Sequence, residues 1–130
     1  MPIEISAVGV TATDLARAVA FYELLGFRFP PVGPGEEHVQ AEVATGGAQL
    51  MIDSVELMTG LLGEPPRPGN LAAFAVRCAT PGDVDAVVQR VSTAGHTVVT
   101  SPWDAPWQQR YATVADPDGH RVDVFAPLPG

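Results

Sequence analysis

The sequence has little of what several large classes of protein require. Its single cysteine, Cys78, excludes an intrachain disulfide framework. Only 7 of its 130 residues are lysine or arginine against 15 acidic residues, and the net charge of −8 disfavours binding to nucleic-acid phosphates. It lacks a basic N-terminal region followed by an apolar core, and it has no apolar run long enough to span a membrane. We therefore expect a soluble, cytoplasmic protein without nucleic-acid or membrane partners.

Apolar residues and turn-forming residues, by contrast, are abundant. The hydrophobic fraction is 46% and the mean hydropathy is +0.15, which is enough for one packed domain or two small halves. Thirteen prolines and thirteen glycines indicate many turns between short elements.

The first half of the sequence predicts a strand, a helix and further strands. Thr13 is the expected N-cap of a helix that starts at Asp14, and Gly26 ends it because glycine readily adopts positive φ. Gly46 and Gly47 indicate a hairpin turn. The expected strands are Ile3–Val10, Phe27–Phe29, His38–Ala44 and Ala48–Asp53, and Ser54–Leu62 is expected as a short helix capped by Ser54.

The same pattern returns in the second half. Thr80 is the expected N-cap of another helix, Pro81 suits its first position, and Gly95 ends it. The run D-P-D-G at Asp116–Gly119 predicts a tight turn, since its proline presets φ and its glycine accepts positive φ. The expected strands are Leu71–Cys78, Thr97–Thr100, Tyr111–Ala115 and Arg121–Phe125.

These two patterns indicate an internal duplication. The helices expected at Asp14–Gly26 and Asp83–Gly95 have equal length, and a strand precedes each of them. We predict an α+β fold of two βαβββ modules that form a curved mixed sheet around a cleft. The first module covers residues 1–63, the linker E-P-P-R-P-G covers 64–69, and the second module covers 70–130.

Two motifs carry a resemblance to a known family. T-D-L-A-R-A-V-A-F-Y-E-L-L-G-F at Thr13–Phe27 and D-P-D-G-H-R-V-D-V-F at Asp116–Phe125 resemble the first helix and the last hairpin of the vicinal oxygen chelate superfamily. That superfamily includes glyoxalase I, extradiol dioxygenases and bleomycin-resistance proteins. The resemblance implies either a metal-dependent enzyme or a binding protein, because fold alone does not fix function.

The metal ligands of those enzymes are not matched. Ala7 falls where the resemblance places the first ligand, the expected strand at Leu71–Val76 is wholly apolar, and Asp123 replaces the last glutamate. The histidines at 96 and 120 are explained by neighbouring turns. We therefore expect no metal, no cofactor and no enzyme. The alternative is a metal-dependent lyase, isomerase or dioxygenase that uses Asp123, His38 and Gln49.

Both tryptophans lie just before the last hairpin. Trp103 and Trp107 fall in an expected loop, where an indole offers a large flat surface for stacking on an aromatic ligand. Arg110 and Tyr111 place hydrogen-bond donors beside them, and Arg110 is also suited to lie over a π-system. This grouping predicts a site for a planar small molecule.

A closer resemblance sharpens that expectation. P-W-D-A-P-W-Q-Q-R-Y at Pro102–Tyr111 is similar to the self-resistance binding proteins of the superfamily, most closely those that bind mitomycin. The resemblance implies that Trp107 stacks on the drug and places Met51 where a second stacking tryptophan stands. It implies a ligand of the mitomycin, quinoxaline-peptide or bleomycin type. The candidate ligand-binding residues are Trp107, Trp103, Arg110, Tyr111, His38, Met51, Phe29 and Asp123.

The expected mechanism is sequestration without chemistry. We expect a homodimer with clefts at the subunit interface, where Met51, Phe29 and His38 of one subunit face Trp107 of the other, and the linker permits exchange of modules. A further alternative is a carrier protein that binds an intermediate in antibiotic biosynthesis.

Overall fold

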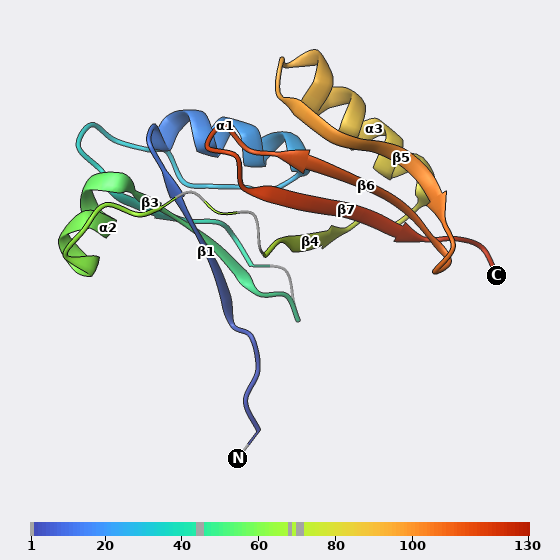
Figure 1. The fold of residues 1–130 in the computed structure, drawn as a ribbon, viewed down its shortest axis with the longest axis horizontal. Coiled ribbons are helices and arrows are strands. Elements are labelled where there is room, and N and C mark those ends of the chain that lie inside the picture. Colours follow the sequence, from blue (N-terminus) through green and yellow to red (C-terminus); the bar gives the residue numbers. More distant parts are fainter. Residues whose placement is uncertain (1, 44–45, 68, 70–71) are drawn as a thin grey trace. The chain divides into compact units, whose positions relative to one another are not determined.

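The chain forms two compact units, each with its own sheet (Figure 1). The structure, a computed structural model, describes residues 2–43, 46–67, 69 and 72–130. The units are Met1–Pro68 and Gly69–Gly130, so the division falls inside the expected linker. Each unit combines at least one helix with a sheet of parallel and antiparallel strand pairs, which confirms the predicted α+β class and the duplicated order of strand, helix and strands.

The first unit has a three-stranded sheet in the order β1-β3-β2, where β1 runs parallel and β2 antiparallel to β3. Helix α1 packs on one face of this sheet through a stripe of buried side chains that includes Phe21 and Tyr22. The elements are β1 (Ala7–Ala12), α1 (Leu15–Leu25), β2 (His38–Gln40), β3 (Gln49–Ser54) and α2 (Val55–Leu62).

Several expectations for the first unit are wrong in detail, among them the strand predicted at His38–Ala44, since β2 covers only His38–Gln40. The N-cap of α1 is Asp14 rather than Thr13, because the Asp14 side chain accepts a hydrogen bond from the backbone N–H of Arg17 at 3.1 Å. Strand β1 starts at Ala7 rather than at Ile3, since the parallel strand β3 begins at Gln49, opposite Ala7, and offers no earlier partner. Phe27–Phe29 forms no strand, and this unit therefore has one strand fewer than the predicted βαβββ module.

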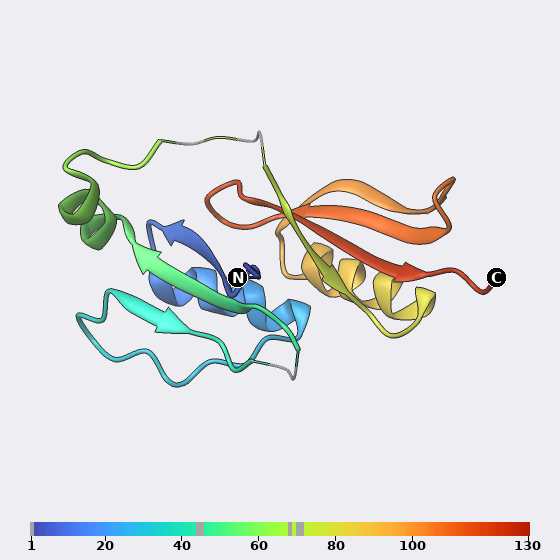
Figure 2. The same ribbon diagram turned by 90° about the horizontal axis from the view of Figure 1, so that it is seen from below.

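The second unit has the complete βαβββ order, with a four-stranded sheet in the order β4-β7-β6-β5 (Figure 2). Strand β4 is parallel to β7, and the other neighbours are antiparallel. The elements are β4 (Phe74–Arg77), α3 (Pro81–Thr93), β5 (Thr97–Ala105), β6 (Gln109–Ala115) and β7 (Arg121–Pro127).

Helix α3 covers one face of this second sheet. The predicted cap is confirmed: the Thr80 hydroxyl and the Asp83 carboxylate bond reciprocally to each other's backbone N–H groups, and Pro81 stands in the first turn. Four valines of α3 are buried together with valines of β6 and β7, which makes an all-aliphatic interior. The valines concerned are Val84, Val87, Val88, Val91, Val114, Val122 and Val124.

Strand β5 is longer than predicted. It continues past Thr100 to Ala105, with register irregularities between Val98 and Trp103, so much of the expected tryptophan loop is strand. The predicted turn at Asp116–Gly119 is confirmed, with Gly119 at φ 89° and the Asp116 side chain accepting two backbone hydrogen bonds. Among the described residues, no helix combines the length and the apolar composition needed to cross a membrane.

Candidate functional site

Three aromatic side chains gather where β5 turns into β6. Trp103 on β5 is the register partner of Tyr111 on β6, and Trp107 stands in the tight turn between these strands. The Trp107 ring packs edge-to-face against both neighbours, with ring centroids 5.6 Å from Trp103 and 5.3 Å from Tyr111. We call Trp103, Trp107 and Tyr111 the aromatic cluster.

The turn itself orients Trp107. The next residue, Gln108, has φ 65°, a left-handed conformation uncommon for a residue with a side chain, and its N–H bonds to the carbonyl of Ala105 at 3.1 Å. The indole Nε1 of Trp107 donates to Oε1 of Gln109 at 3.0 Å. The ring is thus held by a hydrogen bond and two aromatic contacts, while 51% of Trp107 and 41% of Trp103 stay exposed.

A carboxylate adjoins the aromatic cluster. The Tyr111 hydroxyl donates to one oxygen of Asp123, and Thr113 Oγ1 donates to the other oxygen at 2.7 Å. Partial burial, reinforced by the hydrogen bond and the negative charge of Asp123, raises the pKa of Tyr111 to about 12. The phenol therefore stays protonated at neutral pH and acts as a fixed donor. Thr113 is not among the site residues predicted from the sequence. The β6–β7 register places it directly opposite Asp123, and this brings the two side chains within hydrogen-bonding distance.

The cluster and this carboxylate share one face of the second sheet. Ala112, Val114, Val122 and Val124 are fully buried on the α3 face. Because side chains alternate along a strand, Tyr111, Thr113 and Asp123 point to the opposite face, which no helix in the described part of this unit covers. We call this the open face of the second unit.

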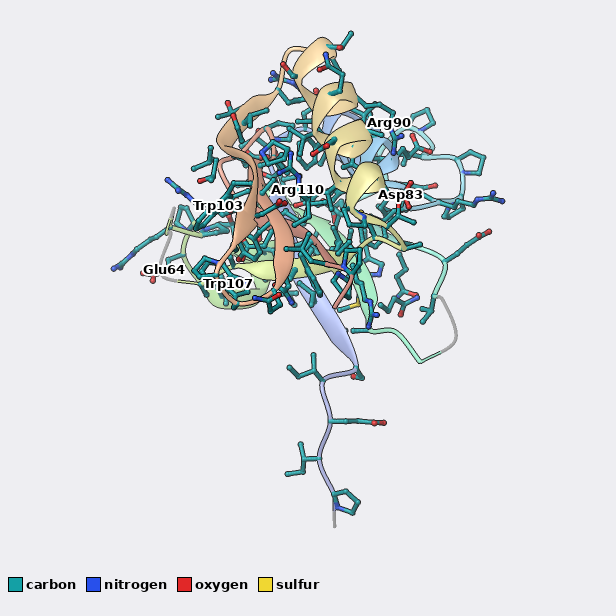
Figure 3. The ribbon with its side chains drawn as sticks, turned by 90° about the vertical axis from the view of Figure 1, so that its right-hand side faces the viewer. Glu64, Asp83, Arg90, Trp103, Trp107 and Arg110 are labelled. Carbon is teal, nitrogen blue, oxygen red and sulfur yellow. The ribbon has the colours of Figure 1, made fainter. Side chains whose placement is uncertain are left out.

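Arg110 is not part of that face. It alternates with Tyr111 and points to the α3 side (Figure 3). Its Nε is 3.0 Å from Asp85 Oδ1 and its Nη1 is 3.1 Å from Asp104 Oδ1. The sequence places Arg110 beside the tryptophans, whereas the structure makes it a link between α3 and the β5–β6 hairpin. It borders a groove of about 400 Å³, whose lining is Asp85, Val88, Gln89, Ser92, Val98, Ser101, Pro102 and Arg110.

The remaining candidates lie in the first unit. His38 and Met51 point to the face of the first sheet opposite α1, because Val39, Leu50 and Ile52 between them are buried. His38 Nδ1 lies 2.5 Å from Asp53 Oδ1, a partner that the sequence did not single out. We call this face the open face of the first unit.

Two neighbours of these residues are also placed. Gln40 Nε2 contacts the Met51 sulfur at 3.8 Å across the β2–β3 pair. Phe29 is half-buried in the segment between α1 and β2, outside any strand, next to Arg28, whose carbonyl accepts from the N–H of Glu42 at 2.8 Å. The eight candidates thus divide into His38, Met51 and Phe29 in the first unit and the other five in the second.

The alternative metal set does not assemble within either unit. His38 and Gln49 belong to the first unit and Asp123 to the second. Internal hydrogen bonds already engage His38 Nδ1, the Gln49 amide nitrogen (3.2 Å to the carbonyl of Ala41) and both oxygens of Asp123. Within the part of the chain that the structure describes, there is no cluster of three or more histidine, cysteine, aspartate or glutamate residues able to hold a metal ion.

Comparison with known proteins decides the family. The profile of the Glyoxalase/Bleomycin resistance protein/Dioxygenase superfamily matches residues 4–124. The chain belongs to this superfamily. The family expected from the helix and hairpin motifs is thereby confirmed, and the fold is the one shared by its solved members.

Relatives within the superfamily cover most of the chain. An uncharacterised protein of Mycobacterium bovis is 37% identical over a match that spans 88% of this chain and 78% of that protein. A superfamily member from Nocardioides is 25% identical with a TM-score of 0.73, covering 100% of this chain and 87% of that one. TioX from Micromonospora sp. ML1 is 27% identical with a TM-score of 0.64, covering 96% and 99%.

Proposed function

We propose that this protein binds a planar aromatic antibiotic and sequesters it without chemical change, as a cytoplasmic self-resistance protein. The observation that carries the proposal is the aromatic cluster on the open face of the second unit. Two tryptophans that stay 41% and 51% exposed are costly to leave in water, and contiguous exposed apolar surface marks an interaction site.

The geometry of the cluster suits a flat guest. The hydrogen bond from Trp107 to Gln109 and the contacts with Trp103 and Tyr111 fix the indole before the ligand arrives, so little rotamer entropy is lost on binding. Stacking on a fixed indole adds about 0.5–1.5 kcal/mol beyond the burial of apolar area. Asp123 adds a carboxylate that is held in place by Tyr111 and Thr113.

The ligand would lie in a slot between Trp107 and a second wall, which we assign to the first unit of the partner subunit. We propose that the protein is a homodimer in which Met51, Phe29 and His38 of one subunit face Trp107 of its partner, with or without exchange of modules. Methionine is suited to such a wall because its flexible thioether makes favourable contacts with aromatic rings. The ligand classes are mitomycins, quinoxaline peptides and bleomycins, and the net charge of −8 favours encounter with cationic members.

The test is calorimetric titration of the protein with mitomycin C, a quinoxaline peptide and bleomycin. For the compound that binds, we expect Trp107→Ala to weaken the affinity by one to a few kcal/mol, about fivefold or more, while the melting temperature stays close to that of the wild type. Val99→Ala is the matched control, because Val99 is an exposed apolar residue of β5 outside the cluster. Equal affinity of the Trp107→Ala protein and the wild type would remove the stacking role.

Two other functions would give different results. A lyase, isomerase or dioxygenase, as the name of the superfamily allows, would purify with a stoichiometric divalent ion and lose its function on chelation. A biosynthetic carrier would bind an intermediate more tightly than the finished drug. Expression in a drug-sensitive bacterium separates the carrier from the resistance protein, since only the latter protects the cell.

A further inference from the structure

The groove between α3 and β5 lies on the face of the second sheet opposite the aromatic cluster. Its volume of about 400 Å³ falls within the range of small-molecule sites, roughly 300–1,000 Å³. Alongside it, β5 changes its register with β6 twice, between Val98 and Thr100 and between Thr100 and Trp103. Irregularities of this kind bend a strand and are common next to binding sites. The groove therefore lies where β5 does not run straight along the helix.

Helix α3 turns a polar stripe towards this groove. Asp85, Gln89 and Ser92 follow one another at spacings of four and three residues, so they lie on one side of the helix above the buried Val88. The Gln89 amide nitrogen donates to Thr93 Oγ1 at 3.1 Å, which leaves its carbonyl oxygen as an acceptor for another molecule. Polar side chains above an apolar floor offer a small molecule both hydrogen bonds and apolar contact.

One end of the groove is charged, with an excess of negative charge. Arg110 carries its single positive charge between the carboxylates of Asp85 and Asp104. Arg110 contacts only Oδ1 of each aspartate, and within the described part of the chain neither Oδ2 has a hydrogen-bond partner. A bound anion would meet two carboxylates and one guanidinium, whereas an ammonium group would find a carboxylate oxygen ready to accept. The charged end therefore favours a cation.

The rest of the groove is neutral and amphipathic. The hydroxyls of Ser92 and Ser101 stand on opposite walls, and Val98 and Pro102 add apolar surface between and beside them. From Asp85 to Ser92 the helix rises by about 10 Å, at 1.5 Å per residue. A hydroxylated ring has this size, and it combines an apolar C–H face with hydroxyl groups along its edge.

We infer that the groove is a second binding site, for a small hydroxylated amine of the amino-sugar class. The ammonium group pairs with Asp85. The hydroxyl groups bond to Ser92 and Ser101, and the C–H face of the ring lies on Val88 and Val98. This site is independent of the proposed antibiotic site, because the groove and the aromatic cluster lie on opposite faces of the sheet.

The test is titration of the isotopically labelled protein with glucosamine at slightly acidic pH, followed by nuclear magnetic resonance. We expect saturable shifts of the Ser92 and Ser101 amide signals. N-acetylglucosamine, which keeps the ring and its hydroxyls but carries no positive charge, should bind at least about tenfold more weakly. Asp85→Asn should weaken glucosamine binding by a similar factor. Glu23→Gln, which removes one negative charge from the exposed side of α1, is the matched control and should bind as the wild type does.

A second variant separates binding from the stability of the link to Arg110. Ser92→Phe fills the groove from an exposed helix position, so glucosamine binding should be lost while the melting temperature stays close to that of the wild type. Equal binding of the two sugars would overturn the assignment of a cation. Shifts that do not saturate, or that persist in Ser92→Phe, would show that the groove is not a site. Antibiotic affinity should be unchanged in Ser92→Phe, and a loss like that of Trp107→Ala would make the groove part of the antibiotic site and contradict its independence.

Discussion

Tyr111 connects the aromatic and the polar parts of the candidate site. Its ring packs against Trp107 and its hydroxyl donates to Asp123. Because Asp123 also accepts from Thr113, both carboxylate oxygens are fixed by the protein's own donors. At the scale of single residues, Asp123 is a carboxylate held by two neighbouring hydroxyls, and the phenol of Tyr111 should show the effect in its titration.

We predict that Tyr111 ionises near pH 12, well above its ordinary value of 10.0. The folded pKa is raised, so the stabilisation is complete below about pH 10 and is lost as the pH rises from about 10 to about 12. The chain contains no lysine, so no lysine ammonium group titrates in this pH range. The measurement is tyrosinate absorbance against pH, with Tyr111→Phe to assign the transition.

Asp123→Asn provides the control for this titration. It removes the charge that disfavours the phenolate and keeps an oxygen acceptor, so the pKa of Tyr111 should move back toward its ordinary value. An unchanged titration in the Asp123→Asn protein would contradict the assigned coupling.

At the scale of elements, the β5–β6 hairpin is tied to α3 by one side chain. Arg110 reaches from β6 to Asp85 on α3 and to Asp104 on β5, and 26% of its side chain is exposed. Exposed ion pairs of this kind contribute little individually, since water and salt screen them. Alternation along β6 places Arg110 and Tyr111 on opposite faces of the sheet. Arg110 therefore links the hairpin to α3 on one face, while the candidate site lies on the other face.

We predict that Arg110→Met lowers the free energy of unfolding by about 1 kcal/mol, the sum expected for two partly exposed ion pairs. Affinity for the antibiotic should stay within twofold of the wild type. Denaturant unfolding and calorimetric titration of the same preparation provide the two numbers. A loss of affinity as large as that of Trp107→Ala would return Arg110 to the binding site, where the sequence placed it.

At the scale of the whole molecule, each unit has a helix on one face of its sheet and an open face opposite. The open faces carry Met51 and His38 in one unit and the aromatic cluster in the other. A single uncovered sheet face is marginal in water, and the superfamily's duplicated modules allow such faces to be covered by pairing.

We predict a particle with twice the 13.6 kDa mass of the chain in sedimentation or light-scattering measurements at micromolar concentration. Ligand should stabilise the dimer, because the proposed slot takes residues from both subunits. A monomer that binds the antibiotic with full affinity would rule out the shared slot while leaving the aromatic cluster intact as a site.

Local sequence determined much of the architecture. The stripe from Leu15 to Tyr22 specifies the buried side of α1, Thr80 and Pro81 specify the start of α3, and Asp116–Gly119 specifies the last turn, because periodicity, capping and turn chemistry act over a few residues. The superfamily motifs were likewise readable, and the profile match confirms them. The sequence also singled out the two tryptophans, although the β5–β6 pairing shows that Trp103 lies in a strand.

Tertiary structure decided which segments become strands and which face of a sheet each side chain reaches, because both depend on strand pairing. Phe27–Phe29 is as β-prone as β2, yet it forms no strand, and Arg28 accepts only a backbone hydrogen bond from Glu42. Ile3 remains exposed because β3 begins at Gln49, opposite Ala7. Register placed Tyr111 beside Asp123 and sent Arg110 to the other face, and a shift by one residue would have reversed the two. The sequence gives the type of each side chain. The face of the sheet that a side chain reaches depends on pairing with strands far away in the sequence, and only the folded sheet provides that pairing.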